Sequence, residues 1–200
     1  MEAFRGNMAP PVTRLDRIAA IFGEHVDVAR AMASVAPDIE QAADRIAESM
    51  RAGGTLFLAG NGGSAADAQH IASELTGRFL RGRRPLPALA LHVNSSALTA
   101  IGNDFGFEHV FARELSALGR AGDVLLAIST SGNSANILHA IAAAREKGMR
   151  VIGLTGASGG EMAGACDLAL CVPSASTQRI QEMHILIGHA ICELLDEQFS

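Results

Sequence analysis

The stretch Leu56-Phe-Leu-Ala-Gly-Asn-Gly-Gly-Ser-Ala-Ala-Asp-Ala-Gln-His-Ile-Ala-Ser-Glu74 contains a change of secondary structure. Its apolar beginning, Leu56 to Ala59, is typical of a buried strand, and the glycine-rich segment 60–63 predicts a tight turn. A run of good helix formers begins at Ser64. The stretch therefore predicts a strand, a turn and a helix, which is the repeating unit of a sheet covered by helices.

The predicted turn has features of a ligand site. It points backbone N–H groups and a helix N-terminus at one spot, which suits an anion such as phosphate. We expect Ser64 to cap the helix, with Asp67 as its capping-box partner three residues on. His70 and Glu74 are four residues apart and therefore share one helical face.

Four arginines follow in the segment 78–84. Arg78 continues the spacing of His70 and Glu74 and is expected to extend their face. The other three, Arg81, Arg83 and Arg84, are interpreted as parts of a solvated loop, because arginines without a known partner are mostly exposed.

The rest of the chain repeats the alternation of strand and helix. Its apolar runs are rich in Val, Ile and Leu, as expected of parallel strands buried on both faces. The expected strands are 55–59, 86–93, 123–129, 150–155 and 168–172, and the expected helices are 64–79, 95–103, 108–118, 133–147 and 177–199. This order predicts an α/β fold: a three-layer, doubly wound, flavodoxin-like sheet of five parallel strands, with ligands at the carboxyl ends of the strands. The glycine-rich segment 153–160 is interpreted as a flexible connection between a strand and a helix.

Two helical patterns, at 12–33 and 37–50, precede the first strand. Residues 1–11, which include Pro10-Pro11, are expected to be a flexible tail, and residues 12–200 a single domain. Apolar helices outside the sheet cover either their own core or another subunit, and the sequence leaves both possibilities open.

Composition narrows the classes of function. The 200 residues carry a net charge of −5, which argues against a nucleic-acid partner, and no apolar run reaches the length of a membrane span. The N-terminus lacks the apolar segment of a secretory signal. The three cysteines form no Cys-x-x-Cys pair and are expected to be reduced thiols of a cytoplasmic protein.

A second candidate site is Ile128-Ser-Thr-Ser-Gly-Asn-Ser-Ala-Asn136, which again follows a strand and begins a helix. Its hydroxyls and backbone N–H groups can bind a phosphate monoester without any fixed positive charge. A single helix cap needs one such residue and not five, so ligand binding is favoured.

A third candidate lies in the last helix, where Gln181, His184 and His189 share one broad face. Together with His70 and Glu74 this helix offers two imidazoles, a carboxylate and an amide oxygen, a donor set that suits a divalent metal such as zinc. The spacing does not decide between His184 and His189.

These segments resemble the sugar isomerase (SIS) domain family, and within it the phosphoheptose isomerases. The resemblance covers most of the chain from about Ala29 onward. Four blocks carry it: Gly60–His70 with Glu74 and Arg78, Gly102–Gly106, Ser129–Ser134, and Arg179–Glu182 through His189.

The resemblance implies a zinc ion held by His70, Glu74, Gln181 and His189, and so selects His189 over His184. It implies a homotetramer with active sites between subunits and with residues 12–52 taking part in assembly. The substrate contacts that it implies are Asn61, Gly62, Gly63, Ser64, Glu74, Arg78, Asn103, Asp104, Ser129, Thr130, Ser131, Ser134 and Gln181.

The implied reaction converts D-sedoheptulose 7-phosphate to D-glycero-D-manno-heptose 7-phosphate through an enediol, with Glu74 as base and His189 as acid/base partner. In the family this step begins the synthesis of ADP-heptose for lipopolysaccharide. Relatives often carry an aspartate before the last helix, but Ser174-Ala-Ser-Thr-Gln178 has no acid. Two other SIS proteins are alternatives: an adaptor that binds the bacterial replication initiator, and a sugar-phosphate sensor.

Overall fold

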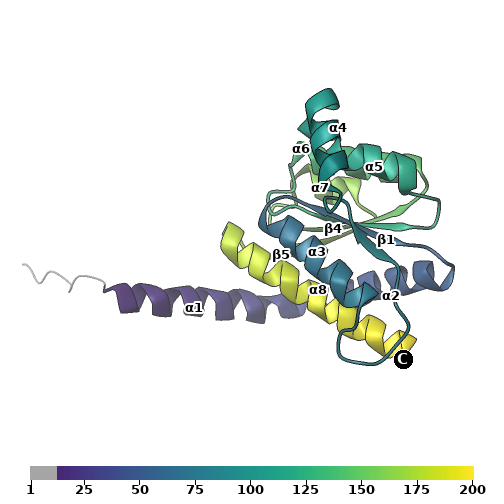
Figure 1. Ribbon diagram of the computed structural model, residues 1–200. Helices are drawn as coiled ribbons and strands as arrows, with labels where there is room; N and C mark the ends of the chain where they lie inside the picture. The colour runs from purple at the N-terminus through teal and green to yellow at the C-terminus, as the bar shows by residue number, and fades with distance from the viewer. Residues whose placement is uncertain (1–12) are drawn as a thin grey trace, which may run out of the picture.

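Five parallel strands form one sheet in the order β2-β1-β3-β4-β5 in the computed structural model, which describes residues 13–200 (Figure 1). The strands are β1 (Leu56–Gly60), β2 (Ala88–Ala90), β3 (Val124–Ile128), β4 (Arg150–Gly156) and β5 (Leu168–Val172). The strand order reverses direction between β1 and β3, which makes their carboxyl ends the switch point where such sheets bind ligands. The predicted doubly wound α/β fold is confirmed.

Helices cover both faces of the sheet. They are α1 (Arg14–Ala31), α2 (Ala36–Arg51), α3 (Gly63–Thr76), α4 (Ser95–Phe105), α5 (Val110–Leu118), α6 (Ala135–Glu146), α7 (Gly160–Ala165) and α8 (Thr177–Phe199), with 3-10 turns η1 (Met32–Val35) and η2 (Phe107–His109). No helix within residues 13–200 is long and apolar enough to cross a membrane.

The core consists of two hydrophobic layers, because neighbouring strand residues point to opposite faces of the sheet. In β1, Leu56 and Leu58 pack against α2, α3 and α8, whereas Phe57 and Ala59 pack against α5 and α6. All residues of β1 and β3 are buried, as predicted for strands covered on both sides. The sheet therefore holds the loops at its carboxyl edge on a rigid base.

The first helix, α1, extends away from the domain (Figure 1). None of its residues 14–31 is buried, although it has the apolar periodicity of a packed helix. Its large apolar side chains are exposed: Leu15, Ile18, Ile21, Phe22 and Val26. By contrast, α2 packs into the core. The expected tail at residues 1–11 lies outside the described residues.

The structure corrects three details of local structure. Ser64 does not cap α3, since the helix begins one residue earlier and Gly62 is its cap residue. The helix ends at Thr76, so Arg78 lies beyond it and does not share the face of His70 and Glu74. The segment 153–160 does connect a strand to a helix, but β4 extends to Gly156 and the short helix α7 begins at Gly160, so the connection is shorter than expected.

Arg83 is a fourth correction, since its side chain is buried and not solvated. Its exposed fraction is 0%, and its guanidinium forms an ion pair with Asp196 of α8, whose exposed fraction is 1%. The two residues are far apart in the sequence, so no local pattern could pair them. Arg81 and Arg84 are exposed, as expected for solvated arginines.

Candidate active site

The loops that follow β1 and β3 are tied together at the switch point. The Asn61 amide donates to Oδ1 of Asn136 at 2.9 Å, and the Asn136 amide donates to Oδ1 of Asn61 at 2.8 Å. Asn136 lies in the first turn of α6 and is 4% exposed. The pair of bonds fixes the glycine loop relative to the hydroxyl-rich loop. The sequence contained Asn136 in the second candidate segment, but nothing marked it as the partner of Asn61.

The glycine loop packs directly against the last helix. Gly62 has a φ of +55°, a conformation that residues with a Cβ rarely adopt, and it allows α3 to begin immediately after β1. A Cβ on Gly63 would lie 2.8 Å from Nε2 of Gln181. Gln181 of α8 is thus in contact with the glycine loop, about two helical turns before the positions of His70 on α3 and His189 on α8. Ser64 is buried behind the loop and its N–H donates to the Asn61 carbonyl at 3.0 Å.

The loop after β3 gathers its hydroxyl groups. The Oγ of Ser129 lies 3.0 Å from that of Ser134 and 3.4 Å from that of Ser131. Gly132 has a φ of +67°, and a Cβ there would lie 2.2 Å from the Gly159 carbonyl oxygen, so the turn requires glycine. The hydroxyls therefore meet at the N-terminus of α6, where the helix dipole favours an anion.

A hollow of about 360 Å³ lies beside this loop. Its polar lining comes from Thr130, Ser131, Asn133, Ser158, Ser174 and Thr177. These side chains are neutral donors, and Thr177 is the first residue of α8. The sequence analysis found Thr130 and Ser131 but missed Ser158, Ser174 and Thr177, because their segments come together only in the folded sheet.

The predicted metal-ligand histidines meet between α3 and α8. The Nε2 atoms of His70 and His189 are 3.0 Å apart, and Nε2 of His70 is 3.4 Å from Oε1 of Glu74. The ring of His189 also stacks on Phe79, with ring centroids 5.7 Å apart. His70 thus joins the two helices, and the sequence-based prediction that they meet is supported by this contact.

Asp67 adds a second carboxylate to this region. It lies one turn before His70 on α3, and its Oδ2 is buried without a hydrogen-bond partner among residues 13–200. Burial raises the pKa of the Asp67 carboxyl above its ordinary value, while the nearby imidazoles of His70 and His189 act in the opposite direction. The sequence analysis considered Asp67 only as a capping residue.

His184 is separate from this cluster. It is fully buried under the sheet, and its Nε2 donates to the Thr155 carbonyl oxygen at 3.3 Å. Burial lowers the pKa of His184 to about 4, with the Thr155 carbonyl opposing the shift, so the ring is neutral at pH 7. His184 is therefore a core residue, whereas His189 lies beside His70.

Two pairs of donor atoms here have separations that a divalent metal would allow. Two atoms bound at tetrahedral angles to one zinc ion lie about 3.3 Å apart, close to the two contacts that His70 makes. The atom Nε2 of His70 is common to both contacts. No group of three or more His, Cys, Asp or Glu side chains with the full geometry of a metal site is present within residues 13–200.

Three predicted substrate residues are not joined to this cluster. Arg78, Asn103 and Asp104 are exposed. Asn103 donates its side-chain amide to Asp104 at 2.7 Å, near the end of α4. Within one chain, the candidate site is therefore built from the loops after β1 and β3, the hollow beside them, and the helices α3, α6 and α8.

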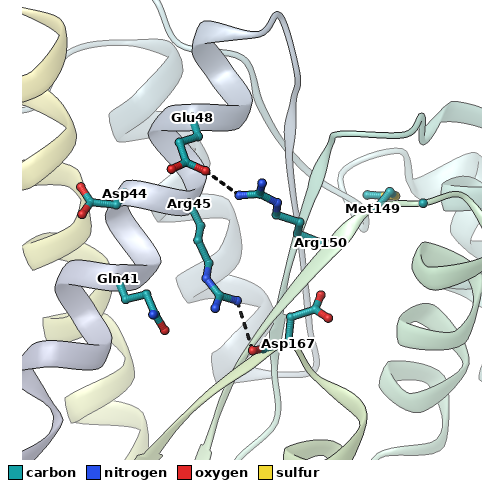
Figure 2. Close-up of a pocket in the computed structure, with 8 residues that line it drawn as sticks. Gln41, Asp44, Arg45, Glu48, Met149, Arg150 and Asp167 are labelled. Carbon is teal, nitrogen blue, oxygen red and sulfur yellow. Dashed lines mark hydrogen bonds and ion pairs between the residues drawn. The ribbon is translucent and has the colours of Figure 1, made fainter.

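A second hollow, of about 810 Å³, is not this site (Figure 2). It lies between α2 and the amino ends of β4 and β5, at the opposite edge of the sheet. Its charged groups bind one another: Arg150 pairs with Glu48 at 2.7 Å, and Arg45 donates to the Asp167 carbonyl at 3.1 Å. These groups are satisfied by one another and do not converge on a ligand.

The comparisons with known proteins agree with the fold. A family model described as SIS domain matches residues 24–156, so the chain has the fold and loops of an SIS domain protein. A phosphoheptose isomerase of Rhodospirillum rubrum is 57% identical over 182 residues, which are 91% of this chain and 97% of the relative. The chain belongs to the phosphoheptose isomerase family.

Solved structures agree with this assignment. The phosphoheptose isomerase of Neisseria gonorrhoeae is 48% identical with a TM-score of 0.88, over 92% of this chain and all of that one. That of Francisella tularensis is 41% identical with a TM-score of 0.90, over 92% of this chain and 99% of that one.

Proposed function

We propose that the protein is an aldose–ketose isomerase that converts D-sedoheptulose 7-phosphate to D-glycero-D-manno-heptose 7-phosphate. The observation that carries the proposal is the meeting of His70 and Glu74 with His189 between α3 and α8, in a chain whose relatives are phosphoheptose isomerases. The product would serve the synthesis of ADP-heptose.

The reaction moves one proton between C1 and C2 of the sugar through an enediol. Glu74 has a carboxylate that accepts this proton, and its side chain is 22% exposed, so a substrate can reach it. His189, held by Phe79, transfers a proton between the two oxygens. A zinc ion bound to His70, Glu74, Gln181 and His189 would polarise these oxygens.

The phosphate group fits the hollow at the other end of the site. The hydroxyls of Ser129, Ser131 and Ser134 and the N-terminus of α6 offer neutral donors to the phosphate oxygens. Ile180 lines this hollow, and His189 lies nine residues further along α8, about 13 Å along the helix axis.

The proposal includes a homotetramer. The exposed apolar side chains of α1 form a large patch of the kind that marks an interface, and Phe22 is 67% exposed. Arg179 of α8 donates to the Ile21 carbonyl at 2.6 Å, and Glu182 contacts His25 at 2.7 Å, so the base of α1 is firmly attached.

A cytoplasmic location is part of the proposal. The cysteines are free thiols: Cys192 is buried, and Cys166 and Cys171 are partly buried. Burial raises the pKa values of Cys166 and Cys192 to about 12, so neither is a reactive thiolate at pH 7. Unreactive free thiols are consistent with a reducing compartment.

A coupled assay with sedoheptulose 7-phosphate tests the activity, with and without a chelator, and metal analysis of the purified protein accompanies it. We expect heptose 7-phosphate to form, the activity to fall on chelation and zinc to restore it. Metal-free protein that isomerises nothing and binds the replication initiator would favour the adaptor instead. Size-exclusion chromatography with light scattering of the wild type and Phe22→Asp tests the tetramer, which the variant should weaken.

A further inference from the structure

Arg83 lies in the loop between α3 and β2, and all its hydrogen-bond donors point inward. Its Nη2 donates to the Glu74 carbonyl oxygen and its Nη1 to the Leu75 carbonyl oxygen, each at 2.9 Å. These carbonyls belong to the last turn of α3, where a helix has no partners of its own for them. Arg83 therefore caps the end of the helix that carries His70 and Glu74.

The same guanidinium is attached to α8. Its Nε donates to Oδ1 of Asp196 at 2.5 Å. Asp196 also accepts from the backbone N–H groups of Leu80 and Arg81 through Oδ2, at 2.8 Å each. Desolvation of Asp196 is outweighed by these hydrogen bonds, and the pKa of its carboxyl lies below the ordinary value. Both oxygens of this carboxylate therefore accept hydrogen bonds.

The network crosses the same helix pair that forms the active site. On α3 it holds the carbonyl of Glu74 itself, and on α8 it holds Asp196, about two turns beyond His189. Because a guanidinium is a planar fork, it holds both helices in one relative position, which a flexible ammonium does not. A shift of about 1 Å between the helices would move the side chains of His70 and Glu74 on α3 away from His189 on α8, although the three must meet at one point.

We propose that Arg83 and Asp196 are positioning residues of the active site: they hold α3 against α8 so that His70 and Glu74 face His189. The inference rests on the proposed function, since it assigns these contacts a role in metal binding and isomerisation. Neither residue touches the substrate. Their effect is transmitted through the backbone of α3.

The chain contains a matched control. Arg81 pairs with Glu197 at 3.0 Å, and each of these side chains is 51% exposed. This pair joins the same loop to the same helix, since Arg81 lies two positions before Arg83 and Glu197 one position after Asp196. It makes no side-chain contact with α3 in the described structure. An exposed pair of this kind contributes little to stability.

The experiment compares Arg83→Lys with Arg81→Lys. We expect Arg83→Lys to weaken zinc binding about 10–100-fold in competition with a chromophoric chelator, as supporting hydrogen bonds of metal ligands do. Its kcat should fall by a similar factor with KM changed less than about threefold, because the substrate's phosphate contacts are intact. Arg81→Lys should match the wild type in both. Asp196→Asn, which keeps an acceptor, gives the same comparison if Arg83→Lys does not fold.

Amide hydrogen exchange of residues 70–76 provides a readout that needs neither metal nor substrate. It should be faster in Arg83→Lys than in Arg81→Lys. Unchanged zinc affinity, kcat and exchange in Arg83→Lys would overturn the positioning role, as would a loss of thermal stability without any of these changes. Wild-type protein without zinc or activity would overturn the proposed function instead, and the exchange comparison alone would then decide the role of Arg83.

Discussion

Replacing Glu74 with glutamine separates the chemistry of the site from its structure. Glutamine has the same shape but cannot accept the C1 or C2 proton, so kcat should fall about 10²–10⁴-fold. This corresponds to about 3–5 kcal/mol of lost transition-state stabilisation. The side-chain contact that is lost, to Nε2 of His70, is 3.4 Å long and partly solvated, so the free energy of unfolding should change by less than about 1 kcal/mol.

The assay measures initial rates with sedoheptulose 7-phosphate at saturating zinc, alongside thermal unfolding and the mass of the assembly. Glu48→Gln is the control, because Glu48 forms a partly exposed ion pair at the amino edge of the sheet (Figure 2). It should retain wild-type kcat. If Glu74→Gln kept activity within severalfold of the wild type while remaining folded, Glu74 would not be the base.

Three further predictions follow from the contacts described. His189→Ala should abolish zinc binding and activity, whereas His184→Ala should keep zinc and lower Tm through a core cavity, as zinc titration and calorimetry would reveal. In a double-mutant cycle on kcat/KM, Asn61→Ala and Asn136→Ala should be non-additive by about 1 kcal/mol or more, since each removes the same pair of bonds. The pKa of Asp196 is lower in the folded state than its ordinary value of 3.8. Its ionised carboxylate therefore stabilises the fold fully above pH 3.8, and this stabilisation is lost as the pH falls through the pKa of the folded state. Asp196→Asn should flatten the acid side of a plot of Tm against pH.

Local patterns were sufficient to predict most of the fold. The buried strands and the change to helical spacing at Gly62-Gly63 identify the parallel sheet, and the long last helix has the predicted bounds. Helix ends were less predictable. The cap residue of α3 is Gly62 and not the expected Ser64, and the helix ends at Gly77, before Arg78. Both glycines adopt non-helical backbone conformations, and the sequence does not show which glycine in a segment will do so.

The sequence predicted which residue types form the candidate site, but it did not predict which side chains contact one another. His70 and Glu74 share a helix face by spacing alone, but their contact with His189 depends on how two distant helices cross. Arg83 was misjudged for the same reason: a buried guanidinium requires a carboxylate, and Asp196 lies more than a hundred residues away. The apolar residues of α1 recur at the spacing of a packed helix. This spacing could not show that the sheet of the same chain leaves the helix uncovered.

The position of α8 after all five strands in the sequence has a consequence for the order of synthesis. This helix contacts α1, α2 and α3, and it carries Gln181 and His189 of the candidate site. While the chain is being made, the strands and the glycine loop are complete before α8 exists, so the growing polypeptide carries only half of that site. The candidate site therefore becomes complete only when α8 has been synthesised and has docked against α3.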